Sequence, residues 1–149
     1  DMNQLFELFV ARYLERAFAQ HPHYRLDIQH QIWLDADHKE KGKPDLWIEV
    51  GNRPILILDT KYKTFDGSPS EADRNQMIVY CHTQRMTHSL LIYADPAPVH
   101  YRAGFQGIWL EAATLSLSGD LAQLRHRCSQ FLQNITDRCD QLLATPSSH

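Results

Sequence analysis

The hydrophobic positions of the chain follow a helical spacing in two stretches. Residues 2–19 carry apolar side chains at the i, i+3, i+4 spacing of one helix face. Residues 119–144 repeat that pattern over a longer distance. The pattern therefore predicts an amphipathic helix at each end of the chain, and N-capping signals at its start predict a third helix over residues 68–85.

Short apolar runs bounded by turn residues predict strands between the helices. Three of them precede the middle helix, over residues 24–34, 44–50 and 55–63, and two follow it, over 89–94 and 107–112. The element order is helix, three strands, helix, two strands, helix. This order predicts an α/β fold in which a central mixed β-sheet is flanked by helices.

Charged side chains lie where an apolar strand ends. The run Ile55–Leu58 is uninterrupted, as expected of a strand covered on both faces, yet Asp59 and Lys61 follow it directly. Strand residues two apart point to the same side, about 7 Å apart. Asp45 opens the neighbouring strand of the predicted hairpin. Charges at the edge of a core are costly unless they are paired, bind a metal or serve chemistry.

The first and middle helices offer polar side chains to the same region. Glu7 lies at the rim of the apolar face of the first helix, so it is either a solvent-exposed charge or an acid that reaches over the sheet. The middle helix has Ser68 as its expected N-cap, Pro69 in the first helical position and Glu71 closing a capping box. Three polar side chains share one of its faces: Asp73, Gln76 and Tyr80.

Composition restricts the class of protein. The 149 residues, 43% of them hydrophobic with no apolar run long enough to span a membrane, predict one soluble globular domain over 1–149 with a disordered tail at 145–149. Three cysteines without a C-x-x-C pair fit reduced thiols in the cytoplasm. The chain begins at Asp1 without a methionine, which suggests part of a longer protein.

The net charge of −3 gives no general attraction to nucleic acid, so binding to DNA would have to be local. Lys and Arg side chains do cluster between residues 39 and 74, either as a solvated basic surface or as phosphate contacts. The residues of this cluster that we predict to contact DNA are Lys41, Lys43, Lys63 and Arg74.

Two interpretations of the charged set remain open from the residues alone. Asp59 and Lys61 could form a simple ion pair at the rim of the sheet. Alternatively, Asp45 and Asp59 could bind a hard divalent cation such as Mg²⁺, which prefers oxygen ligands, while Lys61 orients water or stabilises charge on a phosphate. Glu49 lies roughly 13 Å along the strand from Asp45, too far to share the same ion.

Four segments, in order, resemble the McrC family within the PD-(D/E)XK nuclease superfamily. They are Asn3–Val10, Lys43–Leu46, Leu58–Lys63 and Asp73–Tyr80. Within them, Pro44-Asp45 and Asp59-Thr60-Lys61 resemble the superfamily signature, and Gln76-x-x-x-Tyr80 resembles the Q-x-x-x-Y helix of its RecB-like branch. The resemblance covers roughly residues 3–94.

The resemblance implies a restriction-endonuclease-like core of α-β-β-β-α-β order and a set of roles. The implied catalytic residues are Glu7, Asp45, Asp59, Lys61, Gln76 and Tyr80. Glu7, Asp45 and Asp59 would bind Mg²⁺, with Mn²⁺ as a substitute. Implied partners are DNA and a McrB-like GTPase motor, which would read the base modification. The chain lacks a P-loop motif of its own, so GTP-driven movement would come from that partner.

Three functions therefore remain as alternatives. The first is a Mg²⁺-dependent DNA endonuclease domain of the McrC type, working with a GTPase motor in a modification-dependent restriction system. The second is a RecB-like exonuclease or a standalone restriction enzyme with the same fold. The third is a catalytically silent subunit that binds DNA or assembles the complex.

Overall fold

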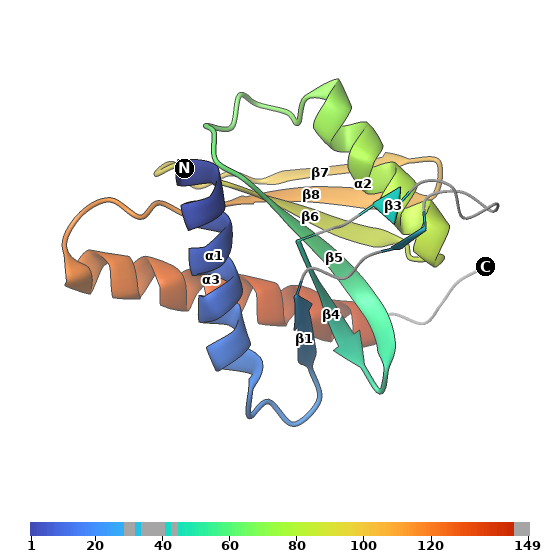
Figure 1. Cartoon of the computed structure of the whole chain (residues 1–149), viewed down its shortest axis with the longest axis horizontal. Coiled ribbons are helices and arrows are strands. Elements are labelled where there is room, and N and C mark those ends of the chain that lie inside the picture. The colour runs from blue at the N-terminus through green and yellow to red at the C-terminus, as the bar shows by residue number, and fades with distance from the viewer. Residues whose placement is uncertain (29–31, 34–40, 43–44, 145–149) are drawn as a thin grey trace.

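The computed structural model describes residues 1–28, 32–33, 41–42 and 45–144, and it confirms the predicted α/β fold. Within these residues six strands form one mixed sheet in the order β1-β4-β5-β6-β8-β7. Helices flank it on both faces (Figure 1). The helices are α1 (Met2–Phe18), α2 (Glu71–Gln84) and α3 (Leu121–Ala144). The strands of the sheet are β1 (Arg25–Ile28), β4 (Leu46–Val50), β5 (Arg53–Lys61), β6 (His88–Tyr93), β7 (Tyr101–Phe105) and β8 (Ile108–Thr114).

The sheet is antiparallel at its two sides and parallel in its centre. β1, β4 and β5 run antiparallel to one another, and β7 runs antiparallel to β8. β5, β6 and β8 are parallel neighbours. Parallel strands require a crossover connection, and α2 supplies the one between β5 and β6. This topology brings the carboxyl end of β5 next to the beginning of β4.

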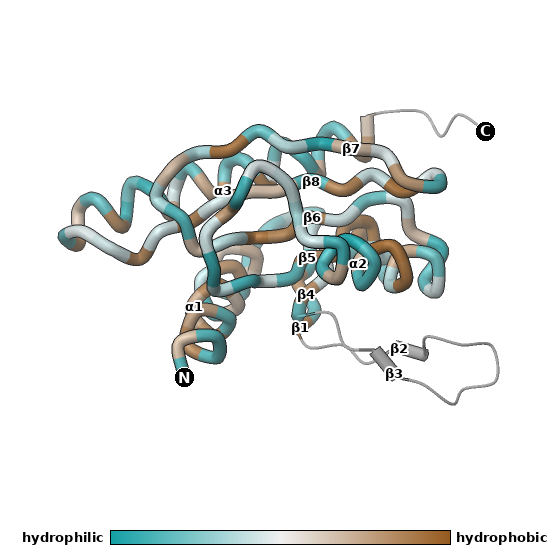
Figure 2. The backbone as a smooth tube through the Cα atoms, turned by 90° about the horizontal axis from the view of Figure 1, so that it is seen from above, coloured by the Kyte–Doolittle hydropathy of each residue, from teal (hydrophilic) through white to brown (hydrophobic). Residues whose placement is uncertain are grey.

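Two hydrophobic clusters fill the space between the sheet and the helices. The first joins α1 and α3 to one face of the sheet, and the second joins α2 to the other face. β5 serves both clusters, because Leu56 and Leu58 face the first and Ile57 faces the second. All three side chains are fully or almost fully buried, which confirms a strand covered on both faces. Figure 2 shows hydrophobic stretches in the inner strands of the sheet.

The first predicted strand is divided between two sheets in the part of it that the structure describes. Among these residues of the predicted range 24–34, Arg25–Ile28 pairs with β4. Ile32–Trp33 forms β2, which pairs instead with β3 (Lys41–Gly42) in a separate two-stranded sheet. The apolar alternation weakens near the end of the predicted strand, and that is where the chain leaves the main sheet. The predicted tail at 145–149 lies outside the described residues.

The turn between β4 and β5 and the N-cap of α2 differ in detail from the prediction. The hairpin turn is formed by Gly51 and Asn52 alone, both with positive φ (55° and 67°), and β5 already begins at Arg53. Two consecutive residues of positive φ are typical of a tight type I′ hairpin. The N-cap of α2 is Ser70 rather than Ser68, because the Ser70 side chain accepts the hydrogen bond from the amide of Asp73.

A strand that the sequence did not predict, β7, forms the edge of the sheet. It pairs with β8 through a turn at Gln106 and Gly107, both of positive φ. Its side chains alternate between half-buried and exposed, so its hydrophobic signal is weak. Gly104 allows the ring of Trp109 to lie against the strand, because a Cβ at Gly104 would approach the ring within 3.2 Å.

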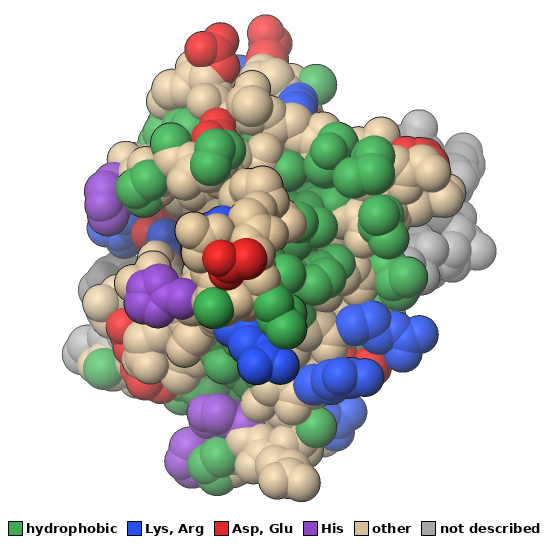
Figure 3. Space-filling view, turned by 90° about the vertical axis from the view of Figure 1, so that its left-hand side faces the viewer, with side chains coloured by type: hydrophobic (Ala, Val, Ile, Leu, Met, Phe, Trp, Pro, Cys, Tyr) green, Lys and Arg blue, Asp and Glu red, His purple; other side chains and the backbone are tan. Residues whose placement is uncertain are grey.

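Helix α1 leaves apolar side chains exposed on its outer side. Met2, Leu5 and Leu8 are each about half exposed, whereas Phe6 and Val10 of the same helix are fully buried. Figure 3 shows hydrophobic side chains gathered on the side of the molecule where α1 lies. No helix in the described part of the chain is long and apolar enough to cross a membrane.

Candidate active site

Strand pairing places Asp45 beside Asp59. Leu46 of β4 is paired with Leu58 of β5, so the residue before β4 begins lies next to the residue after Leu58. The amide of Asp45 donates a hydrogen bond to Oδ1 of Asp59 at 3.3 Å. In return, Oδ2 of Asp45 accepts hydrogen bonds from the amide and the hydroxyl of Thr60, at 2.8 and 2.6 Å. The two carboxylates are therefore held at fixed positions by neighbouring backbone.

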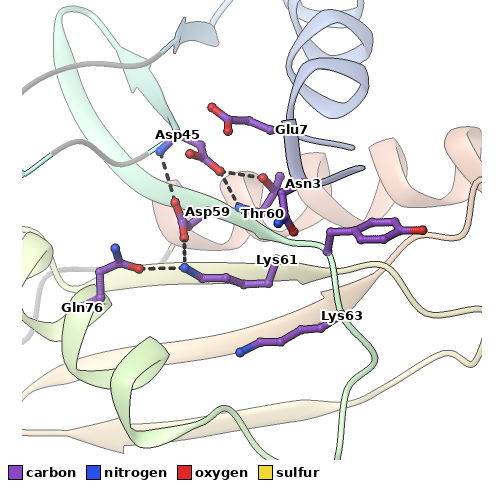
Figure 4. Close-up of a pocket in the computed structure, with 9 residues that line it drawn as sticks. Asn3, Glu7, Asp45, Asp59, Thr60, Lys61, Lys63 and Gln76 are labelled. Atoms are coloured by element: carbon purple, nitrogen blue, oxygen red, sulfur yellow. Dashed lines mark hydrogen bonds and ion pairs between the residues drawn. The ribbon is translucent and has the colours of Figure 1, made fainter. Parts of the chain in front are cut away.

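Lys61 connects β5 to helix α2. Its Nζ lies 2.8 Å from Oδ2 of Asp59 and donates a hydrogen bond to Oε1 of Gln76 at 2.9 Å. The side-chain nitrogen Nε2 of Gln76 donates in turn to the hydroxyl of Tyr80 at 3.1 Å. Figure 4 shows Asp59, Lys61 and Gln76 joined in one line of contacts. The predicted ion pair thus exists, but as part of a larger polar network.

Asp45, Asp59, Lys61 and Gln76 line an open pocket of about 370 Å³. Helix α1 contributes to it because the buried ring of Phe6 packs against Tyr62, with ring centroids 5.9 Å apart. This contact places the next residue, Glu7, at the pocket, where it extends from α1 toward Asp45 (Figure 4). The residues lining the pocket are Asn3, Glu7, Asp45, Asp59, Thr60, Lys61, Tyr62, Lys63 and Gln76.

Burial controls the charge of Asp59. The side chain is almost completely buried, and this burial, together with the nearby Asp45 carboxylate, raises the pKa of Asp59 to about 7. The ammonium of Lys61 acts in the opposite direction but does not cancel the increase. Two carboxylates in one poorly solvated place repel each other, and a bound cation would relieve that repulsion.

Lys61 remains a strong cation in spite of its burial. Burial lowers its pKa, but the ion pair with Asp59 and the charges of Asp73 and Asp45 outweigh that effect, so the pKa of Lys61 is raised. The site therefore holds a permanent positive charge beside two carboxylates. A fixed ammonium of this kind can stabilise negative charge that develops on a phosphate.

Comparison with known families assigns this chain. A family model described as "McrBC 5-methylcytosine restriction system component" matches residues 1–94, nearly two thirds of the chain and every pocket residue. The chain belongs to this McrBC family. The McrC-type resemblance stated from the sequence is thereby confirmed at the level of the family.

A solved structure shares the fold of this McrBC family member. It is a chain of the refined half-complex from a tetradecameric assembly of Thermococcus gammatolerans McrB AAA+ hexamers with bound McrC, with a TM-score of 0.68 and 21% identity. The match covers 91% of the present chain and 33% of the solved one, so the present chain spans about a third of that length. A comparison with curated protein sequences found no match.

The donor set of this McrBC protein fits a magnesium ion. In the described parts of the chain, no group of three His, Cys, Asp or Glu side chains is close enough to hold a metal by itself. Mg²⁺, however, usually binds through one or two carboxylates and keeps several waters. Asp45 and Asp59 satisfy that requirement, and the ammonium of Lys61 offsets only part of the increase that burial and the Asp45 carboxylate cause in the pKa of Asp59. Glu7 faces the same pocket from α1.

Five of the six predicted catalytic residues line the pocket, and one does not. Glu7, Asp45, Asp59, Lys61 and Gln76 all line the pocket, as expected. Tyr80, which was expected to line it too, is instead buried in the cluster under α2, where its hydroxyl accepts a hydrogen bond from the side chain of Gln76.

Of the four residues predicted to contact DNA, Lys63 and Arg74 interact with other side chains of the protein. Lys63 lines the pocket, but its Nζ is paired with Asp73 at 2.7 Å. The guanidinium of Arg74 lies over the ring of Phe105, 5.2 Å from its centroid. Lys43 and the side chain of Lys41 lie outside what the structure describes.

Four residues at the site had no role predicted from the sequence: Asn3, Thr60, Tyr62 and Asp73. Asn3 lines the pocket from α1, and Thr60 binds the Asp45 carboxylate. Asp73 is buried and lies near two lysines, with Oδ2 2.7 Å from Nζ of Lys63 and Oδ1 3.7 Å from Nζ of Lys61. The only sequence signal for Asp73 was its position on the helix face of Gln76 and Tyr80.

Proposed function

We propose that this chain is the Mg²⁺-dependent nuclease domain of a McrC-type subunit, which hydrolyses phosphodiester bonds of DNA. The observation that supports this most strongly is the arrangement of Asp45, Asp59 and Lys61 around one pocket at the end of β5. Two carboxylates next to a permanently charged lysine can hold a cation and a phosphate at the same place. Membership of the McrBC family supports a role in a restriction system.

The roles of the side chains follow from their contacts. Asp45 and Asp59 would hold Mg²⁺, which when bound polarises the phosphate and lowers the pKa of a water ligand. Lys61 places its ammonium at the pocket, where it stabilises charge on the phosphate and orients the attacking water. Gln76 fixes the position of that ammonium through its hydrogen bond. Glu7 adds a carboxylate on the α1 side of the same pocket.

A motor partner is part of this proposal. The solved chain with the same fold comes from an assembly of McrB AAA+ hexamers with bound McrC. We infer that this chain also works with a McrB-like GTPase, which delivers DNA to the pocket. The modest basic character of the pocket agrees with this inference, because the chain carries a net charge of −3 and would bind DNA weakly without help.

The test is cleavage of closed circular DNA with the chain alone and with its co-encoded motor and GTP. We expect nicking that requires Mg²⁺ or Mn²⁺, stops in EDTA, and falls by at least about 10²-fold in Asp59→Asn and Lys61→Ala. Glu71→Gln is the matched control, because Glu71 is exposed on α2 and does not line the pocket. Cleavage by both site variants at the wild-type rate would exclude this active site.

The two alternative functions give different results in the same assay. A RecB-like exonuclease would degrade linear DNA and leave closed circles intact. A silent assembly subunit would bind DNA or the motor without cutting either substrate under any metal condition. The intact set of Asp45, Asp59 and Lys61 favours catalysis, since buried charges without a function cost stability.

A further inference from the structure

Asp73 occupies an unusual position for an acidic residue in the first turn of a helix. It is only 8% exposed, although such residues usually face solvent near the positive end of the helix dipole. Its Oδ2 lies 2.7 Å from Nζ of Lys63 and accepts a hydrogen bond from the hydroxyl of Tyr93 at 3.4 Å. Asp73 is therefore held in place from two sides.

The other oxygen of Asp73 points to the candidate active site. Oδ1 lies 3.7 Å from Nζ of Lys61, compared with 2.8 Å between that Nζ and Asp59. Nζ of Lys61 is in close contact with Asp59 and Gln76, whereas Asp73 lies within ion-pair range but beyond a normal hydrogen-bond distance. Within the part of the chain that the structure describes, Asp59 and Asp73 are the two carboxylates within 4 Å of this Nζ.

In the proposed reaction Asp59 binds the cation, whereas Asp73 does not. A cation at Asp45 and Asp59 would neutralise much of the negative charge that Asp59 now offers to Lys61. Gln76 is neutral and cannot replace that charge. A partly buried ammonium next to a divalent cation and without a carboxylate would be repelled from the pocket.

We propose that Asp73 is a positioning residue that keeps the ammonium of Lys61 in the pocket while a divalent cation occupies Asp59. This proposal rests on the proposed nuclease function, because that function places the cation at Asp59. Lys63 and Tyr93 prevent Asp73 from turning away, so Nζ of Lys61 has less than 1 Å to move to form a close ion pair. Asp73 acts through Lys61 and does not need to touch the substrate.

A labelling experiment tests this role without DNA. An amine-reactive ester is applied with and without saturating Mg²⁺, and modification of Lys61 is measured by peptide mass spectrometry. In wild type and in Glu71→Gln, which removes a charge from the same helix turn, Mg²⁺ should leave Lys61 labelling nearly unchanged. In Asp73→Asn, Mg²⁺ should raise it several-fold. Equal labelling of Lys61 in wild type and Asp73→Asn with Mg²⁺ would overturn the proposal, as would an increase that does not depend on Mg²⁺.

Cleavage kinetics give a second, separate test. Asp73→Asn should lower kcat by about 10²-fold with little change in the KM for DNA, and Asp73→Glu should restore most of the rate. Lys63→Gln separates the two lysines bound by Asp73, because it should mainly raise the KM for DNA. If Lys63→Gln lowers kcat as much as Asp73→Asn does, Asp73 acts through Lys63 and the proposal is wrong.

The two tests also separate this inference from the proposed function. If wild type never cleaves DNA with Mg²⁺ and its motor, the nuclease function is wrong, and the labelling result alone decides whether Asp73 positions Lys61. If wild type cleaves and Asp73→Asn cleaves equally well, only the role of Asp73 is excluded.

Discussion

Asp45 and Asp59 are connected through the backbone of opposite strands. The amide of Asp45 donates to the Asp59 carboxylate, and the amide of Thr60, the residue after Asp59, donates to the Asp45 carboxylate. Each acidic side chain is thus oriented by the strand that carries the other one. This reciprocal arrangement depends on the pairing of β4 with β5, so the hairpin register positions the two carboxylates.

The raised pKa of Asp59 predicts how stability changes with pH. An acid whose pKa is about 7 in the fold and 3.8 when unfolded stabilises the fold fully below pH 3.8 and loses that contribution as the pH rises through 7. Asp59→Asn should therefore increase the free energy of unfolding at pH 8, by at least about 1 kcal/mol, and have little effect near pH 4. Urea unfolding in EDTA at both pH values measures this. A variant that is less stable than wild type at pH 8 would contradict the assigned burial cost.

Mg²⁺ should stabilise the wild-type fold, because a cation relieves the repulsion between Asp45 and Asp59. At a Mg²⁺ concentration 100-fold above Kd the expected gain is about 2.7 kcal/mol, readable as a rise in Tm. Asp59→Asn should lose most of this gain. Glu71→Gln, which removes an exposed charge away from the pocket, should keep it. An equal rise in Tm for all three proteins would place the cation elsewhere.

Thr60→Val tests the support of Asp45 without changing a proposed ligand. The substitution keeps the side-chain shape and the Thr60 amide but removes the hydroxyl that donates to Asp45 at 2.6 Å. We expect a 10- to 100-fold weaker affinity for Mg²⁺, the usual scale for loss of such a supporting hydrogen bond. Calorimetric titration with Mg²⁺ measures it. Thr60→Ser keeps the hydroxyl and should bind like wild type, so equal losses in both variants would contradict the role of this hydrogen bond.

The central strand should control stability, whereas the outer side of α1 should not. Leu58 of β5 is fully buried between the sheet and helices α1 and α3. Leu58→Ala should therefore lower the free energy of unfolding by about 2–5 kcal/mol. Leu8 is 51% exposed, and Leu8→Ala should change it by less than about 0.5 kcal/mol. Urea unfolding of both variants makes the comparison. A large loss in Leu8→Ala would show that this side of α1 is covered in solution.

Elements with a strong and regular hydrophobic pattern could be predicted from the amino-acid sequence. The unbroken run Ile55–Leu58 predicted a strand buried on both faces, and the structure confirms it, because burial on two sides leaves no place for a polar residue. The same run made Asp59 and Lys61 conspicuous. Their spacing, together with Asp45 at the start of the paired strand, was enough to predict one charged group at the end of the hairpin.

Other features were decided only by the tertiary structure. β7 has no clear apolar alternation, and it becomes a strand because the exposed edge of β8 offers it hydrogen-bond partners. Tyr80 and Gln76 lie one helical turn apart, yet packing of α2 on the sheet buries the first and leaves the second at the pocket. Ser70 rather than Ser68 caps that helix, because the first helical residue is Glu71 and not Pro69.

Asp73 shows the physical reason for this division. In the sequence it is an acid in the first turn of a helix, a position where such residues commonly interact with solvent and the helix dipole. Its burial beside Lys61 and Lys63 depends on where the crossover from β5 to β6 sets α2 on the sheet. Local pattern can assign a residue to an element and a face. Only the packing of elements that are distant in sequence decides which charges meet.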